Sequence, residues 1–253
     1  MRFRLALLPL LLTGCATSTP TMNGRLQAET YGPKRGSDVQ TLIVVLQGED
    51  APDHHGFARS AARTIPGAAA VALVRSGDTD HRSPPDGHGT GAGDDRTRDH
   101  LASVGDTITA LRVRYPRART IVVGDAGGAA IAANLAGIRP ALIDGMVLVG
   151  CPCTLGEWRQ RVKQTQDVGS GREGLDPLQT AGGILPSLRA AVLVGADDAV
   201  TPIAVSRAYA EALALRGVAT DYRILPGRGH DLLNDPEVLA ATERLAAAML
   251  KKG

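Results

Sequence analysis

Short apolar runs alternate with longer amphipathic stretches along most of the chain. Six of these runs are mostly rich in Val and Ile and are bounded by Gly, Pro or Asp, as buried parallel strands are. The six runs are residues 41–46, 69–74, 120–123, 146–149, 191–194 and 221–225. A seventh stretch, residues 27–31, is predicted to add an antiparallel strand at an edge of the sheet.

Segments with helical periodicity lie between these runs, at residues 101–114, 128–137, 203–216 and 236–251. Regular alternation of helices and strands predicts an α/β fold, a doubly wound and mostly parallel sheet with helices on both faces. The chain has only two Phe, one Trp and four Tyr, so Ala, Val, Leu and Ile must fill the core. We find no internal repeat and expect residues 25–253 to form a single domain.

Two segments interrupt this alternation. Residues 76–98 are crowded with Gly, Asp, His and Pro, and residues 151–187 carry the only Trp, Trp158. Long loops above the carboxyl ends of parallel strands are where such folds build their sites. We therefore expect residues 151–187 to form a short cap-like insertion that shapes a pocket.

The N-terminal residues 1–15 have the pattern of a secretion signal. A positively charged start is followed by an apolar stretch, residues 5–12, that is too short to span a bilayer. The signal ends in Leu-Thr-Gly-Cys, which resembles the lipobox of bacterial lipoproteins. This resemblance implies that Cys15 is lipidated and that residues 16–24 form a tether. An ordinary secretory signal with an unmodified Cys15 is the alternative.

Because Ala16 rather than Asp follows the Cys, the resemblance implies anchoring at the outer membrane, facing the periplasm. The chain has 28 Lys and Arg against 26 Asp and Glu, and without Arg2 and Arg4 of the signal the charges cancel. A neutral chain with few aromatic side chains lacks the electrostatic footprint and the stacking surfaces of nucleic-acid-binding proteins. We expect no nucleic-acid partner, and contact with the membrane through the lipid anchor only.

The two other cysteines, Cys151 and Cys153, are separated by one proline. A disulfide across this spacing closes a small and strained ring, so we expect two buried thiols instead. No further Cys is available and no His lies nearby in sequence, so we expect no metal site here and no cofactor.

The run at 120–123 leads into Gly124-Asp125-Ala126-Gly127-Gly128 and then into a helix of small residues. This strand, tight turn and helix resemble the nucleophile elbow, Gly-x-Ser-x-Gly, of the α/β-hydrolases, the superfamily of serine esterases and peptidases. Two further motifs follow in the order that this family uses. Asp198 comes after the next-to-last predicted strand, where the family places its acid, and His230 comes after the last strand, where the family places its His.

The resemblance implies an α/β-hydrolase fold with Asp198 and His230 as the acid and the base. It also implies an oxyanion hole formed by the backbone N–H of Gly127 and by that of Gly48 or Glu49. The nucleophile position, however, is occupied by Ala126, and a methyl group cannot attack a carbonyl. The family's common His residues are also replaced, by Asp125 and by Gln47.

These departures predict an envelope lipoprotein related to serine esterases and peptidases that is impaired or non-catalytic, a pseudoenzyme. Its expected partner is a small ester- or amide-like molecule. In a second hypothesis Asp125 is the nucleophile, as in the Asp-centred elbow of haloalkane dehalogenases and epoxide hydrolases, which the turn also resembles.

A third hypothesis is a non-catalytic protein that binds a ligand or a divalent metal through the loop at residues 76–98. Asp and His side chains that are possible metal ligands are frequent there, namely Asp78, Asp80, His81, Asp86, His88, Asp94 and Asp95. Their spacing matches no calcium or zinc motif, so a solvated loop is the simpler interpretation.

Overall fold

A computed structural model describes residues 26, 28–33, 35–47, 54–73, 97–163 and 174–251 of the 253-residue chain. Seven strands form one sheet in the order β1-β3-β2-β4-β5-β6-β7. The strands are β1 (Ala28–Tyr31), β2 (Thr41–Leu46), β3 (Ala68–Leu73), β4 (Arg119–Asp125), β5 (Gly145–Val149), β6 (Arg189–Gly195) and β7 (Ala219–Leu225). β1 runs antiparallel to β3 at one edge, and the other neighbours are parallel. The predicted strands and the antiparallel edge strand are confirmed.

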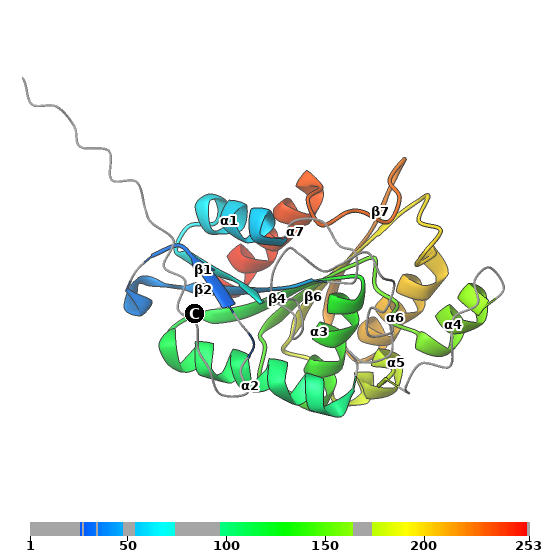
Figure 1. Cartoon of the computed structure of the whole chain (residues 1–253), viewed down its shortest axis with the longest axis horizontal. Coiled ribbons are helices and arrows are strands. Elements are labelled where there is room, and N and C mark those ends of the chain that lie inside the picture. The colour runs from blue at the N-terminus through cyan, green and yellow to red at the C-terminus, as the bar shows by residue number, and fades with distance from the viewer. Residues whose placement is uncertain are drawn as a thin grey trace, which may run out of the picture.

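Helices cover both faces of the sheet (Figure 1). On one face lie α1 (His54–Thr64) and α7 (Pro236–Leu250). On the other lie α2 (Arg98–Arg114), α3 (Gly127–Ile138) and α6 (Ile203–Leu215). The helix α1 was not predicted from the sequence, because its buried residues include one large apolar side chain, Phe57, beside His54, Ala58 and Ala61.

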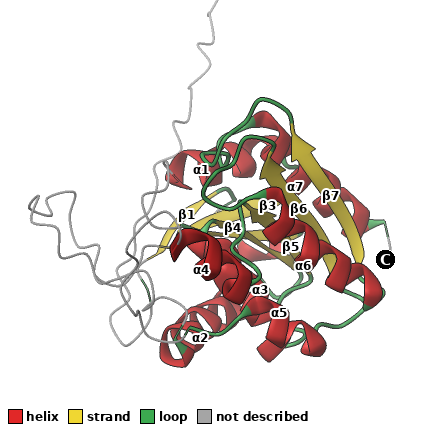
Figure 2. Cartoon of the chain, turned by 90° about the vertical axis from the view of Figure 1, so that its right-hand side faces the viewer, coloured by secondary structure: helices red, strands yellow, loops and turns green. Residues whose placement is uncertain are grey.

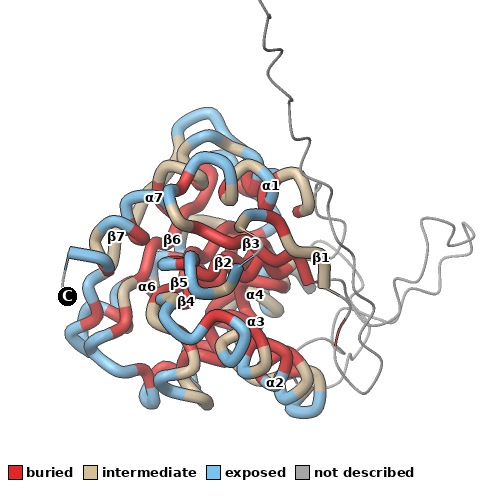
Figure 3. The backbone as a smooth tube through the Cα atoms, turned by 90° about the vertical axis from the view of Figure 1, so that its left-hand side faces the viewer, coloured by how far each residue is buried: buried red, intermediate tan, exposed pale blue. Residues whose placement is uncertain are grey.

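The central strands are buried along most of their length because helices pack on both faces (Figure 3). Every residue of β2 and of β3 is buried, and four of the six residues of β3 are alanine. Such small side chains let the helices approach the sheet closely. Within the described residues, no helix combines the length and the apolar character that a membrane span requires.

The predicted insertion contains α4 (Leu155–Lys163), α5 (Pro177–Thr180) and the short 3₁₀ turn η3 (Ala181–Gly183). Figure 2 shows α5 beside α3. The fully buried Asn134 of α3 holds this region in place. Its side-chain amide donates to the carbonyl oxygen of Leu175 at 2.9 Å, and its side-chain oxygen accepts from the Thr180 hydroxyl at 2.9 Å. This part of the insertion is therefore fixed to the body of the fold.

The expectation of two separate thiols in this insertion was wrong. Cys151 and Cys153 form a disulfide, with their Cα atoms 5.1 Å apart. Both residues are fully buried, just after the end of β5. The backbone between them turns sharply enough to bring the two Cβ atoms together, which sequence spacing alone did not indicate.

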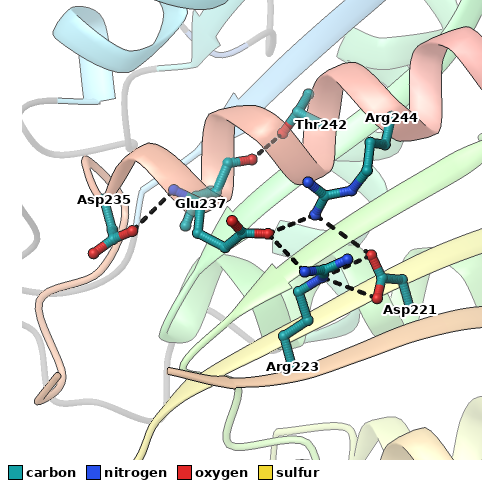
Figure 4. Close-up of polar contacts among 7 residues, drawn as sticks. Asp221, Arg223, Asp235, Glu237, Thr242 and Arg244 are labelled. Carbon is teal, nitrogen blue, oxygen red and sulfur yellow. Dashed lines mark hydrogen bonds and ion pairs between the residues drawn. The ribbon is translucent and has the colours of Figure 1, made fainter. Parts of the chain in front are cut away.

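Ion pairs between side chains of the edge strand β7 and of α7 connect these two elements (Figure 4). Arg223 pairs with Asp221 at 3.0 Å and with Glu237 at 3.1 Å. Arg244 closes the ring, with Glu237 at 2.6 Å and Asp221 at 3.5 Å. Asp235 caps α7 by accepting from the backbone N–H of Glu237 at 2.9 Å.

Asp235→Ala is expected to lower the free energy of unfolding by about 1 kcal/mol, the usual cost of losing a helix N-cap. Glu237→Gln serves as the comparison, because it weakens only half-exposed ion pairs and should cost at most about 0.5 kcal/mol. Urea unfolding of both variants measures the difference. Equal losses in the two variants would show that the cap contributes no more than the ion pairs do.

Candidate active site

The strand β4 passes into α3 through one residue, Ala126. Ala126 has φ 47° and ψ −112°, a backbone conformation that residues with a side chain rarely adopt. Holding it there costs about 1–3 kcal/mol, which the surrounding structure must offset. The turn is therefore as tight as the nucleophile elbow that the sequence resembles, and residue 126 stands at its tip.

Two glycines make this turn possible. A Cβ on Gly124 would clash with the backbone of Gly128 and Ala129, where the strand and the helix almost touch. A Cβ on Gly128 would clash with the carbonyl oxygen of Leu46 at the end of β2. The Gly-x-Ala-x-Gly pattern is thus required by backbone packing, whatever the residue at its centre.

Asp198, the predicted acid, lies in the loop that follows β6. Asp198 is 5% exposed, and one of its oxygens, Oδ1, accepts from the backbone N–H groups of Val200 and Thr201 at 2.9 and 2.8 Å. The other oxygen, Oδ2, accepts from the Thr201 hydroxyl at 2.7 Å and lies 2.9 Å from Nδ1 of His230. These bonds fix the carboxylate in a single orientation toward the imidazole.

The loops that carry Asp198 and His230 are bound to each other (Figure 1). The backbone N–H of Asp197 donates to the carbonyl oxygen of Arg228 at 2.9 Å. Gly195 has no room for a side chain, because a Cβ would clash with the carbonyl oxygens of Arg228 and Gly229. Asp197 is exposed, and Asp198 is the residue that contacts the imidazole.

The pair shifts the pKa of both partners toward the charged forms. The hydrogen bond to Asp198 raises the pKa of His230, and this effect exceeds the opposing effect of burial. Burial raises the pKa of Asp198, whereas the hydrogen bonds from His230 and Thr201 lower it. Together these hydrogen bonds outweigh burial, so the pKa of Asp198 lies below its usual value. With Nδ1–H donated to Asp198, the neutral imidazole leaves Nε2 free of a proton and able to act as a base.

The end of β5 connects the elbow with the imidazole. The backbone N–H of Ala126 donates to the carbonyl oxygen of Val149 at 2.9 Å. The next residue, Gly150, has φ 49°, and a Cβ there would lie 3.2 Å from Cε1 of His230. Ala126 and His230 thus both contact the end of β5.

Asp125, the alternative nucleophile, lies inside the sheet. It is the last residue of β4, pairs with Val149 of β5 and is 4% exposed. Burial raises its pKa to about 7, with His230 lowering it and Asp231 and Asp198 raising it. Its Oδ1 is buried without a hydrogen-bond partner among the described residues. Because Asp125 is buried within the strand and Ala126 is the residue at the turn, the geometry favours residue 126 as the reacting position.

Asp125→Asn is expected to change stability in a pH-dependent way. A carboxyl whose pKa is raised on folding destabilises the folded chain only when it ionises. The loss of stability is absent below about pH 3.8, the ordinary pKa, and is complete above about pH 7. The free energy of unfolding of the variant should therefore rise relative to the native chain between pH 4 and 7, by as much as about 4 kcal/mol. Urea unfolding at pH 4, 5.5, 7 and 8 measures this, and a constant difference across that range would contradict it.

Of the predicted oxyanion donors, Gly127 is the first residue of α3, where backbone N–H groups have no acceptor within the helix. The helix dipole also favours negative charge at this end. Gly48, Glu49, Cys15 and residues 76–96 lie outside the described part of the chain. Among the described residues, no cluster of three or more His, Cys, Asp or Glu side chains is placed to hold a metal ion.

Sequence reasoning missed two residues of this site. Thr201 bonds the acid and also lies 3.2 Å from Nδ1 of His230 through its hydroxyl. A Thr three residues after an Asp is a common turn pattern and was available as a signal. Gly150 gave no signal, because only the fold shows that the imidazole packs against it.

Comparison with known proteins gave structural matches only. No family model and no curated protein matches the sequence. An esterase of Pyrococcus furiosus has 13% identity and a TM-score of 0.66, over 93% of this chain and 91% of that one. A carboxylesterase of Lactobacillus plantarum has 16% identity and a TM-score of 0.65, over 94% and 98%. An acetyl ester-xyloside bifunctional hydrolase of Caldicellulosiruptor lactoaceticus has 17% identity and a TM-score of 0.60, over 88% of each chain.

The matches with these neighbours extend over 88–94% of this chain, and its mostly parallel seven-stranded sheet with helices on both faces is consistent with them. The chain therefore has the α/β-hydrolase fold. At these identities the comparison establishes the fold alone.

Proposed function

We propose that this chain is a bacterial envelope protein related to serine esterases and peptidases, and that it binds a small ester- or amide-like ligand without forming an acyl intermediate. The observation that carries the proposal is the contrast within one site. The acid and base are in hydrogen-bonding contact at 2.9 Å, whereas the residue at the tip of the elbow is Ala126.

The chemistry of the remaining groups supports binding. An imidazole with an unprotonated Nε2 accepts a hydrogen bond, and the N-terminus of α3 offers N–H donors to a carbonyl oxygen. The carbonyl oxygen of an ester or an amide can accept from these N–H groups, and the N–H of an amide can donate to Nε2. Without a hydroxyl or thiol at residue 126, the covalent step of a serine hydrolase has no attacking atom.

The test uses the native chain lacking residues 1–15, with p-nitrophenyl butyrate for turnover and butyranilide for binding. We expect butyranilide to shift the imidazole NMR signals of His230, and p-nitrophenol release to equal that of a His230→Gln variant. Release well above that variant would contradict the proposal. If that release disappeared in Asp125→Asn, the hypothesis of Asp125 as the nucleophile would replace the present proposal.

The location at the envelope is a separate part of the proposal and rests on the signal and Cys15. Radiolabelled palmitate should label the full chain expressed in a bacterium, and the label should be lost in Cys15→Ser. The Cys15→Ser variant should also be absent from the membrane fraction, in which the native chain is found. An unlabelled native chain that is secreted in free form would show an ordinary signal peptide instead.

A further inference from the structure

A pocket of about 380 Å³ opens at the amino ends of the strands, at the opposite end of the sheet from Ala126 and His230. Arg119 and Arg189, the first residues of β4 and β6, line it, with β5 between them. Arg112 from the end of α2 completes the set of three guanidinium groups. We call this the basic pocket. Seven-residue β4 separates it from the elbow by roughly 20 Å, at about 3.3 Å per residue.

The charges of the basic pocket are only partly balanced. Asp144, the carboxylate of its lining, pairs with Arg119 at 3.1 Å and accepts from the backbone N–H of Thr120 at 2.8 Å. Arg112 donates from Nη1 to the carbonyl oxygens of Ala141 and Leu142, which holds it at the rim. The half-buried side chain of Arg189 has no hydrogen bond or ion pair within the described parts of the chain. Two positive charges therefore remain in excess.

Apolar side chains form the rest of the wall. Ile143, Leu188 and Met249 are at most 7% exposed and line the pocket, and Leu185 at its mouth is 42% exposed. A guanidinium group matches the planar geometry of a carboxylate and binds it through two parallel hydrogen bonds. An apolar wall beside such a group favours a ligand that carries a hydrocarbon part on its anionic group.

We propose that the basic pocket binds a small amphipathic carboxylate, such as a medium-chain acyl anion, with the carboxylate on Arg189 and the hydrocarbon part against Leu185 and Met249. The volume lies at the lower end of the range for small-molecule sites, which suits a ligand of this size. This site is separate from the candidate active site and does not depend on the function proposed for it.

Equilibrium dialysis with radiolabelled octanoate tests the proposal on the chain lacking residues 1–15. Native protein should bind octanoate, Arg189→Gln should bind it at least about tenfold more weakly, and Leu185→Ser should bind it several-fold more weakly. Arg63→Gln is the matched control, because it removes the same charge from an exposed position on α1, and it should bind as the native chain does. His230→Gln should also bind as the native chain does, which separates this site from the active site.

Competition with octanol and with inorganic phosphate identifies which part of the ligand is recognised. Both should compete much more weakly than unlabelled octanoate, because each lacks one half of the recognised structure. Octanol competing as well as octanoate would overturn the role of the arginines, and phosphate competing as well would overturn the role of the apolar wall. Equal octanoate binding by Arg189→Gln and Arg63→Gln, or no binding at millimolar octanoate, would overturn the site itself.

Discussion

Ala126→Ser is expected to convert the chain into an esterase. A hydroxyl at residue 126 would lie next to the end of β5, where the imidazole that Asp198 orients also packs. The strained backbone conformation of residue 126 is already formed. Loss of the nucleophilic Ser from a working triad enzyme costs about six orders of magnitude in rate. Restoring it here should raise p-nitrophenyl butyrate hydrolysis at least about 10³-fold above the native chain.

Three further variants show whether such a gain comes from this site. Ala196→Ser adds the same hydroxyl to an exposed loop position and should leave hydrolysis at the native level. Adding His230→Gln or Asp198→Asn to Ala126→Ser should remove most of the gain, because the hydroxyl then loses its oriented base. A gain that survived His230→Gln would mean that the added hydroxyl acts without the pair.

Gly124→Ala is expected to have the largest effect on stability. The added methyl group would overlap backbone atoms of Gly128 and Ala129 rather than a side chain that can move aside. The strand and the helix would have to separate, in the core of the sheet, and overpacking of this kind exceeds the usual 1–3 kcal/mol when only backbone can yield. We expect a loss of more than about 4 kcal/mol, or failure to fold.

Gly182→Ala is the matched control for this prediction, because its added methyl group would meet no atom within 4 Å. Its unfolding midpoint in urea should stay close to that of the native chain. A folded Gly124→Ala variant with the same midpoint as Gly182→Ala would show that the close contact between β4 and α3 is not required.

Most of the sheet was predictable from the sequence because its strands are short, apolar and separated by clear turn residues. β2 was located to the residue, and the other strands to within a few positions at each end. The helix α1 was missed, since Phe57 is the one large apolar side chain among its buried residues, and the others are His54, Ala58 and Ala61. The disulfide was missed because ring strain depends on local backbone geometry that spacing does not reveal.

The elements of the candidate site were predictable for a different reason. A Gly-rich turn after one strand, an Asp after a second and a His after a third come together in any parallel sheet, because the carboxyl ends of its strands share one edge. The contacts that orient the pair were not predictable. Thr201 and Gly150 act through distances that only the folded chain fixes.

The central claim is that the site keeps the geometry of a serine hydrolase and lacks only its nucleophile. Treatment with a fluorophosphonate, followed by mass spectrometry of the intact chain and of its peptides, tests this most directly. We predict no adduct on the native chain, one adduct on Ala126→Ser that maps to residue 126, and loss of that adduct when His230→Gln is added. An Ala126→Ser chain that is folded but unlabelled would contradict the claim, and so would an adduct on the native chain.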